Sequence, residues 1–186
     1  MDESVRQAMQ RWPDVPAVHG WLGLDEAGRW LLKGEPITHP GLVAFINRNY
    51  EHDEAGRWFF QNGPQRGYVR LAYTPWVLHV DGSGRLFTHT GRPVASVDGA
   101  LVDEEGNLVL ATEAGPGLVE TGSLAAVAEW LRNADGSAAG PEALEDPAAI
   151  GTRLEYAGHA VPLGGIRRAD VPARFGFEPD PAPGEA

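Results

Sequence analysis

Short runs of β-forming apolar residues, separated by polar turn segments, recur along most of the chain. This arrangement is typical of strands joined by tight turns. Hairpins are predicted over residues 19–33, 50–61, 76–90 and 97–111, and further strands over residues 68–73, 153–156 and 160–163. The pattern therefore predicts a chain built mainly from consecutive hairpins.

One turn motif recurs between these strands. Asp25, Asp53, Asp81 and Asp103 are each followed three residues later by a glycine. Aspartate opens a turn by accepting a hydrogen bond from its own backbone two residues on, and glycine takes the positive φ that returns the chain to a strand. We expect each copy to be a hairpin turn. Calcium binding is not expected, because the adjacent acids of these turns point apart instead of converging on an ion.

Three segments show helical spacing instead. Residues 3–12 form a short amphipathic helix, which we expect to lie across the sheet as a lid. A second helix starts after Thr38 or His39 as N-cap, with Pro40 in its first turn. A third covers residues 123–133 and is capped by Ser123. The residues predicted to face inward are Val5, Met9, Trp12, Leu42, Val43, Phe45, Ile46, Leu124, Val127, Ala128 and Leu131.

The order of hairpin followed by helix occurs twice. Aligning Asp25 with Asp103 also brings the second and third predicted helices together, which indicates an internal duplication. The predicted fold class is α+β, with two small lobes built from repeated β-hairpin plus helix units and antiparallel sheets. The expected divisions are residues 1–92 for the first lobe with the N-terminal helix, 93–177 for the second, with a surface linker at 133–149, and 178–186 for a disordered tail.

Composition and charge narrow the function. The net charge is −11, and the 15 Lys and Arg residues are scattered, so neither nucleic acid nor an anionic membrane is an expected partner. The absence of cysteine removes disulfides and thiolate chemistry. The chain has no signal-peptide pattern and no apolar run of roughly 20 residues. A cytoplasmic protein is the expectation.

Several segments between residues 20 and 80 resemble one bacterial family. They are Gly28-Arg29-Trp30, Gly34-Glu35-Pro36-Ile37, Gly41-Leu42-Val43-Ala44-Phe45, Gly56-Arg57-Trp58-Phe59-Phe60, Val69-Arg70-Leu71 and Thr74-Pro75-Trp76-Val77. Their order and spacing are similar to those of the "domain of unknown function twelve eighty-five" family. The resemblance implies a two-lobe α+β fold with repeated motifs, a cleft between the lobes and a suggested role in ligand sensing or signal transduction. It implies no catalytic residues.

Common catalytic and cofactor signatures are missing from the sequence. His79 and His89 are the best metal pair, but a turn that places Val80 opposite Arg85 would put them on opposite sheet faces. Neither Ser83 nor Ser123 lies in a nucleophile elbow. Phosphate-loop and dinucleotide fingerprints are also absent. No catalytic residue, metal site or cofactor is predicted.

One polar and aromatic cluster remains as a candidate ligand site at the lobe junction. Arginine provides a planar fork for a carboxylate or phosphate, and tryptophan and tyrosine provide broad apolar walls. The candidate ligand-binding residues are Gln61, Gln65, Arg66, Tyr68, Trp76 and Arg92. By contrast, Trp21, Trp30 and Trp58 recur at equivalent positions of the turn motif and are assigned to the core.

The leading hypothesis is a non-enzymatic binding or regulatory module for a small anionic or amphipathic ligand. A first alternative is a protein-interaction module or homodimer that pairs through an exposed strand edge. A second alternative is an enzyme with an unfamiliar site that uses Glu35, Asp98 and His39.

Overall fold

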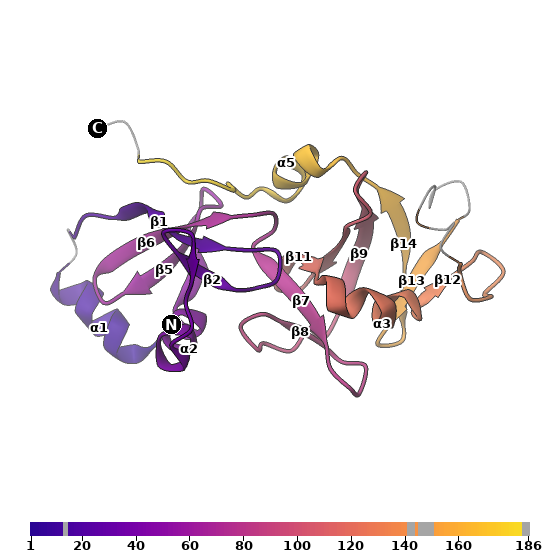
Figure 1. Cartoon of the computed structure of the whole chain (residues 1–186), viewed down its shortest axis with the longest axis horizontal. Helices are drawn as coiled ribbons and strands as arrows, with labels where there is room; N and C mark the ends of the chain where they lie inside the picture. The colour runs from indigo at the N-terminus through magenta and orange to yellow at the C-terminus, as the bar shows by residue number, and fades with distance from the viewer. Residues whose placement is uncertain (13–14, 141–143, 145–150, 184–186) are drawn as a thin grey trace. The chain divides into compact units, whose positions relative to one another are not determined.

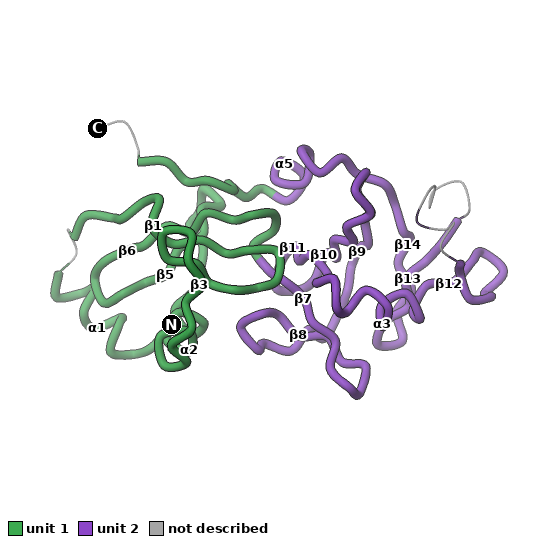
Figure 2. Tube along the Cα trace, in the orientation of Figure 1, with its two compact units in different colours: residues 1–75, 176–186 green, residues 76–175 purple. Residues whose placement is uncertain are grey.

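The chain folds into two compact units. The computed structural model describes residues 1–12, 15–140, 144 and 151–183. Unit 1 comprises residues 1–75 and 176–186, and unit 2 comprises residues 76–175 (Figure 2). Each unit contains a β-sheet of its own and helices (Figure 1), so the expected α+β class is confirmed.

Unit 1 is built on a six-stranded sheet with the order β3-β2-β1-β6-β5-β4. Its elements are α1 (Glu3–Arg11), β1 (Val18–Leu24), β2 (Trp30–Leu32), β3 (Glu35–Pro36), α2 (Pro40–Arg48), β4 (Tyr50–His52), β5 (Trp58–Asn62) and β6 (Gln65–Leu71). His39 caps α2 as expected, since its Nδ1 accepts a hydrogen bond from the Leu42 amide at 3.2 Å. Ile46 of α2 is buried, as its helical spacing predicts, but Leu42 of the same predicted face is exposed.

Unit 2 is built on an eight-stranded sheet with the order β12-β13-β14-β9-β10-β11-β7-β8. Its strands are β7 (Trp76–Val80), β8 (Leu86–Thr88), β9 (Val97–Val102), β10 (Leu108–Thr112), β11 (Gly115–Val119), β12 (Leu131–Arg132), β13 (Arg153–Tyr156) and β14 (His159–Gly165). Its helical segments are η1 (Thr121–Ser123), α3 (Leu124–Ala128), η3 (Arg168–Asp170) and α5 (Val171–Phe175).

Six strands of unit 2 follow the same order as the six strands of unit 1. In unit 1 the meander β1-β2-β3 leads through α2 to the meander β4-β5-β6, and β1 and β6 are parallel neighbours. In unit 2 the meander β9-β10-β11 leads through α3 to β12-β13-β14, and β9 and β14 are parallel neighbours. The registers also agree. Gly23 of β1 pairs with Arg70 of β6, and at the matching position of unit 2 Leu101 of β9 pairs with Gly164 of β14. Residues can therefore be matched between the units strand by strand.

The predicted acid-to-glycine turns are present in both units. At Asp25, the carboxylate accepts hydrogen bonds from the amides of Ala27 and Arg29, at 3.0 and 2.8 Å, and Gly28 has a φ of 78°. The turns at Asp53, Asp81 and Asp103 make the same pair of carboxylate bonds. A fifth turn at residues 133–137 begins with asparagine instead of aspartate. The Asn133 amide donates to the Ser137 carbonyl and the Gly136 amide to the Asn133 carbonyl, and the aspartate turns make the same two backbone bonds.

Two expectations about the sheets were wrong. The sheets are mixed, since β1–β6, β9–β14 and β7–β11 are parallel pairs. Residues 115–117 were expected to form a loop but belong to β11. A Cβ at Gly117 would lie 2.6 Å from the Cγ of Leu78, so glycine at this position gives Leu78 the space to pack against the strand.

The pairing of β7 with β11 also assigns residues 76–92 to unit 2, whereas they were expected in the first lobe.

The third predicted helix is shorter than its spacing suggested. It ends at Ala128, and Leu131 lies in β12. Ser123 makes no side-chain cap bond; its hydroxyl oxygen instead accepts a hydrogen bond from the Val80 amide at 2.9 Å. Of the linker expected at residues 133–149, residues 141–143 and 145–149 lie outside the described part of the chain.

The C-terminal segment is bound to unit 1 as far as the structure describes it, although a disordered tail was expected from residue 178. The Leu71 amide donates to the Pro179 carbonyl at 2.7 Å, and the Glu178 amide donates to the Gly56 carbonyl at 3.0 Å. Phe177 and Pro181 are buried. Residues 184–186 of the expected tail lie outside the described residues.

The three tryptophans assigned to the core differ in burial. Trp30 and Trp58 are buried, as expected. Trp21 is 53% exposed. The expectation was wrong for Trp21 because sheet pairing places it on the opposite side of β1 from the buried Leu22 and Leu24.

Candidate functional site

A pocket of 450 Å³ lies in unit 1 between α1, the segment that follows it, and the β5–β6 hairpin. We call it the α1 pocket. Its lining residues are Met9, Trp12, Val15, Ala17, Gln61, Pro64, Arg66 and Tyr68. The helix side supplies apolar surface and the hairpin side supplies polar groups, a combination that suits an amphipathic ligand.

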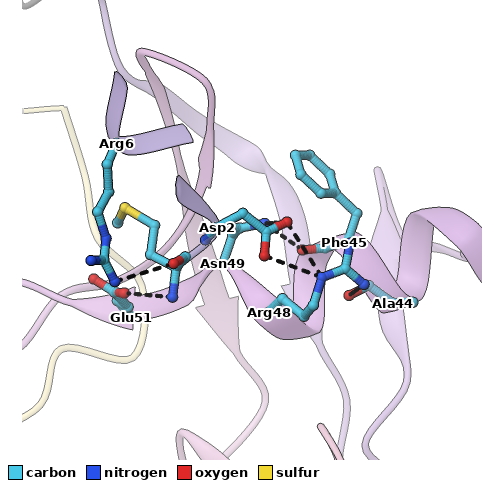
Figure 3. Close-up of polar contacts among 8 residues, drawn as sticks. Asp2, Arg6, Ala44, Phe45, Arg48, Asn49 and Glu51 are labelled. Carbon is cyan, nitrogen blue, oxygen red and sulfur yellow. Dashed lines mark hydrogen bonds and ion pairs between the residues drawn. The ribbon is translucent and has the colours of Figure 1, made fainter. Parts of the chain in front are cut away.

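The N-terminus of α1 is fixed to the C-terminal end of α2 by a polar cluster (Figure 3). The Asp2 amide donates to Oδ1 of the buried Asn49 at 2.7 Å, and Arg48 Nε contacts both Asp2 carboxylate oxygens at 3.2 and 3.3 Å. The hydrogen bond from Arg48 is the main cause that lowers the pKa of Asp2. Asn49 also donates to the Phe45 carbonyl at 2.9 Å. These contacts set the position of α1, and with it the helix wall of the pocket.

Arg66 is the cationic group of the pocket. Its Nε donates to the Gln61 side-chain oxygen at 3.3 Å, and its guanidinium carbon lies 4.2 Å from the centre of the Phe59 ring. Gln61 is itself buried and donates to the Gly63 carbonyl at 2.9 Å. Within the described residues, no carboxylate forms an ion pair with Arg66. The guanidinium is thus oriented by neighbours but keeps its charge available to an anion.

Tyr68 forms an ordered wall next to Arg66. Its ring stacks on His19 at 4.6 Å, and its hydroxyl donates to Asp53 at 3.1 Å. Burial opposes ionisation of Asp53, but hydrogen bonds from Arg57 and Tyr68 outweigh burial and hold the pKa of this carboxyl below its usual value. His19 Nδ1 lies 2.9 Å from the Pro181 carbonyl oxygen, which joins the wall to the C-terminal segment.

The structure brings three of the six predicted ligand-binding residues into the α1 pocket. They are Gln61, Arg66 and Tyr68. Gln65 does not line the pocket, and its amide nitrogen donates to the Pro16 carbonyl at 3.3 Å. Trp76 and Arg92 belong to unit 2, where the Trp76 indole donates to the Ala114 carbonyl and the Arg92 amide donates to the Thr88 hydroxyl. The three grouped residues stand close in sequence on one hairpin, which is why the sequence could suggest them together.

The prediction missed the helix side of the pocket. Met9 and Trp12 were assigned to a lid helix but not to the site. Their helical spacing was the available signal, because a lid that lies on a sheet must contact the residues beneath it. Of the residues named for an enzymatic alternative, Glu35 lies in β3 and His39 caps α2, while Asp98 belongs to unit 2.

The two candidate metal-binding histidines share a sheet face, contrary to expectation. Val80 pairs with Leu86 and not with Arg85, so the register differs by one residue from the predicted one. The alternation then places His79 and His89 on the same side. Even so, the described residues contain no group of three His, Asp or Glu side chains that could hold a metal ion.

No helix in the described parts of the chain has the length and apolar character needed to cross a bilayer.

The fold of this chain resembles that of proteins with known structures. Two crystal structures of DUF1285 family proteins are similar to this chain. The protein from Silicibacter pomeroyi DSS-3 has a TM-score of 0.57 and 17% sequence identity, over 83% of this chain and 85% of that chain. The protein from Shewanella baltica OS155 has a TM-score of 0.42 and 12% identity, over 56% of this chain and 87% of that chain. The first match confirms the expected resemblance at the level of the fold.

The chain belongs to the family designated DUF2944, described as "Protein of unknown function (DUF2946)", whose model matches residues 1–182. No curated protein matches the chain.

Proposed function

We propose that this protein is a non-enzymatic regulatory module that binds a small anionic or amphipathic ligand in the α1 pocket. The observation that carries the proposal is Arg66, a cation without an ion-pair partner among the described residues, set beside the aromatic side chains of Trp12 and Tyr68. A planar guanidinium binds a carboxylate or phosphate, and the aromatic walls bind the apolar part of the ligand. The lining residues include no carboxylate, histidine or serine, so they suit binding better than catalysis.

Unit 2 supplies an internal comparison that supports this role. We infer that the two units are copies of one ancestral unit, because their strand order and registers agree. The residues that match Gln61, Arg66 and Tyr68 in unit 2 are Glu155, Ala160 and Pro162. The same hairpin therefore forms without an amide, an arginine or a tyrosine at these positions. Gln61 and Tyr68 also make bonds within unit 1, but the unpaired charge of Arg66 among the described residues is better explained by a ligand than by the needs of the fold.

A thermal-shift screen with a panel of small organic carboxylates and phosphates tests the proposal. We expect at least one compound to raise the melting temperature of the wild-type chain. Arg66→Gln should weaken its binding by about tenfold or more, since a hydrogen bond to a charged group contributes roughly 1.5–3 kcal/mol. Trp12→Ala should weaken binding of the same compound by removing an apolar wall.

Arg29→Gln is the matched control. Arg29 also belongs to unit 1, is exposed, and forms an ion pair with Asp25 in a turn outside the α1 pocket. The Arg29→Gln substitution removes the same charge from the same unit, so the affinity of this variant for the compound should equal that of the wild-type chain. Equal affinity of Arg66→Gln and Arg29→Gln would contradict the proposed site.

Assembly through a sheet edge has less support as an alternative. The β3 edge of unit 1 carries Glu35 and Pro36, and both a charge and a proline on an edge strand disfavour pairing with another chain. Leu32 and Leu42 are partly exposed apolar side chains in this unit, at 47% and 39%. Size-exclusion chromatography of Leu32→Ser and Leu42→Ser against the wild-type chain would reveal any assembly that uses them.

A further inference from the structure

A second cavity of unit 1 lies on the sheet face that carries Trp21. It has a volume of 560 Å³ and runs over β1, β2 and β6. We call it the Gly23 groove. Its lining residues are Gly20, Trp21, Leu22, Gly23, Leu24, Leu31, Lys33, Gly34, Arg70, Leu71 and Ala72. None of them lines the α1 pocket, so the two cavities provide independent observations.

Gly23 forms the floor of the groove. It pairs with Leu31 on one side and with Arg70 on the other, so a row of side chains across three strands is interrupted at its centre. A glycine inside a strand often marks a place where a ligand approaches the backbone closely. The missing side chain leaves a trough whose two walls are Leu31 and Arg70.

The fold does not require glycine at this position. The backbone of Gly23 is not left-handed, and an added Cβ would lie 3.5 Å from the Arg70 carbonyl oxygen and 3.6 Å from the Leu31 Cβ, which are ordinary contacts. The matching residue of unit 2 is Leu101, which lies opposite Gly164. A Cβ at Gly164 would be 3.3 Å from a Leu101 methyl group, so unit 2 accommodates a leucine at the position of Gly23, with its glycine on the neighbouring strand.

The groove is cationic in an acidic protein. Its lining residues include Lys33, the single lysine of the chain, and Arg70, but no carboxylate, although the net charge is −11. Lys33 Nζ lies 4.0 Å from the centre of the Trp21 ring. Arg70 Nε lies 3.7 Å from a carboxylate oxygen of Asp180, and both side chains of this pair are mostly exposed. An exposed pair of this kind contributes little and yields readily to a better-placed anion.

An irregularity in β1 presents Trp21 to the groove. Between Val18 and Leu22 the register against β6 shifts, because β1 advances four residues while β6 advances two. Gly20 takes a φ of 72° within this bulge. Bulges re-aim side chains and are common next to functional sites. The result is a half-exposed indole beside Lys33, in a groove that Arg70 also lines, where a flat apolar ring can stack.

We propose that the Gly23 groove binds a small planar aromatic anion. The ring lies over Gly23 against Trp21 and Leu31, and the carboxylate or phosphate binds Lys33 and Arg70. This inference does not depend on the α1 pocket. It rests on an open glycine floor that the fold does not need and on the only lysine of an acidic chain.

Two-dimensional NMR titrations can test the groove and the α1 pocket separately, because each cavity contains one tryptophan. The probes are naphthalene-2-carboxylate and 1-naphthyl phosphate, with uncharged naphthalene-2-carboxamide as the comparison. We expect either anion to shift the NMR signals of the Trp21 indole and the Gly23 amide. The uncharged carboxamide should bind at least about tenfold more weakly than the carboxylate. Equal affinity for the carboxamide, or no shift at Trp21 and Gly23 with either anion, would overturn the proposal.

Gly23→Leu fills the groove with the side chain that unit 2 already carries, and should abolish the Trp21 shift. Lys33→Gln/Arg70→Gln removes both cations at exposed positions and should weaken binding about tenfold or more, which keeps the test decisive if Gly23→Leu does not fold. Arg66→Gln should leave the Trp21 shift unchanged. Unchanged binding in the groove by a folded Gly23→Leu variant, or by the double variant, would refute the proposed groove. A missing shift at the Trp12 indole, with the Trp21 shift retained, would count only against the α1 pocket.

Discussion

His89 shows how one partly buried residue couples stability to pH. Its ring lies 5.6 Å from that of Trp76, and Nδ1 accepts a hydrogen bond from the Val77 amide at 3.3 Å. Burial, aided by the charge of His79, lowers the pKa of His89 from 6.5 to about 3. Between these two pH values the unfolded chain takes up a proton that the folded chain does not. Stability is therefore fully present above pH 6.5 and is lost as the pH falls toward 3.

Replacing His89 should flatten this pH dependence. The wild-type free energy of unfolding should fall by up to about 1.4 kcal/mol per pH unit below pH 6.5 because of this group. His89→Gln keeps an acceptor but cannot titrate, so urea unfolding between pH 6.5 and 4 should show a shallower slope. His159→Gln, at an exposed position of the same unit, is the control and should keep the wild-type slope. A slope for His89→Gln equal to that of the control would contradict the prediction.

Single residues were predictable where local chemistry decides their role. His39 as a helix cap and the turn-forming aspartates follow from hydrogen bonds within a few residues. The exposure of Trp21 and the shared face of His79 and His89 depend on pairing between strands, which local spacing does not fix. The Asp81 turn explains why the predicted register was wrong at the histidines. The Asp81 amide donates a hydrogen bond to the Arg85 carbonyl, which keeps Arg85 within the turn and not in the strand. A one-residue change in turn length moves each later side chain to the other face.

At the scale of elements, the C-terminal segment depends on one of the repeated turns. Residues 57 and 178 form a parallel bridge, and the Glu178 amide donates to the Gly56 carbonyl. A Cβ at Gly56 would overlap the carbonyl oxygen of Gly176. The glycine therefore serves both the positive φ of its turn and the close approach of this segment.

Gly56→Ala should detach the C-terminal segment, whereas Gly84→Ala should not. Both glycines have nearly the same φ, 74° and 77°, so both substitutions cost about 1–2 kcal/mol in backbone strain. Only Gly56 has a neighbour that an added Cβ would meet. Amide hydrogen exchange at Leu71, which donates to Pro179, should accelerate by about tenfold or more in Gly56→Ala relative to Gly84→Ala. Equal protection in the two variants would show that the segment does not need this glycine.

Elements with strong local signals were predicted well, and elements defined by distant partners were not. The hairpin turns and α2 have aspartate, glycine and cap signals in the sequence. β11 begins Gly-Pro-Gly, a typical loop signal, yet it forms a strand because Gly117 fits beneath Leu78. Residues 178–183 are rich in proline and acid, but backbone hydrogen bonds of Glu178 and Pro179 hold them against the rest of unit 1. In both cases the tertiary partner overrides the local preference.

At the scale of the whole molecule, the order of elements was predictable but the pairing of strands was less so. Hairpin spacing indicates which strands are antiparallel neighbours, because short turns leave no other choice. The parallel pairs β1–β6 and β9–β14 join strands that are far apart in sequence. The three α1-pocket residues on the β5–β6 hairpin were predictable because they lie close in sequence. The Gly23 groove could be recognised only once the parallel pairing of β1 with β6 was known.

The division into units predicts that residues 76–175 fold alone, while residues 1–75 need the segment that follows Phe175. All described strand pairs of the second sheet lie within 76–175, whereas residues 176–183 complete unit 1 through Phe177, Pro179 and Pro181. The isolated fragment 76–175 should show a cooperative unfolding transition. Fragment 1–75 should be less stable than the same region of the full chain.

A synthetic peptide of residues 176–183, added in trans, should raise the melting temperature of fragment 1–75 as a bound ligand does, and restore protection of the Leu71 amide. A peptide with Phe177→Ala and Pro181→Ala lacks both buried anchors and should have little effect. If both peptides act equally, sequence-specific docking of the segment is wrong. If fragment 1–75 alone is as stable as in the full chain, unit 1 does not depend on residues 176–183.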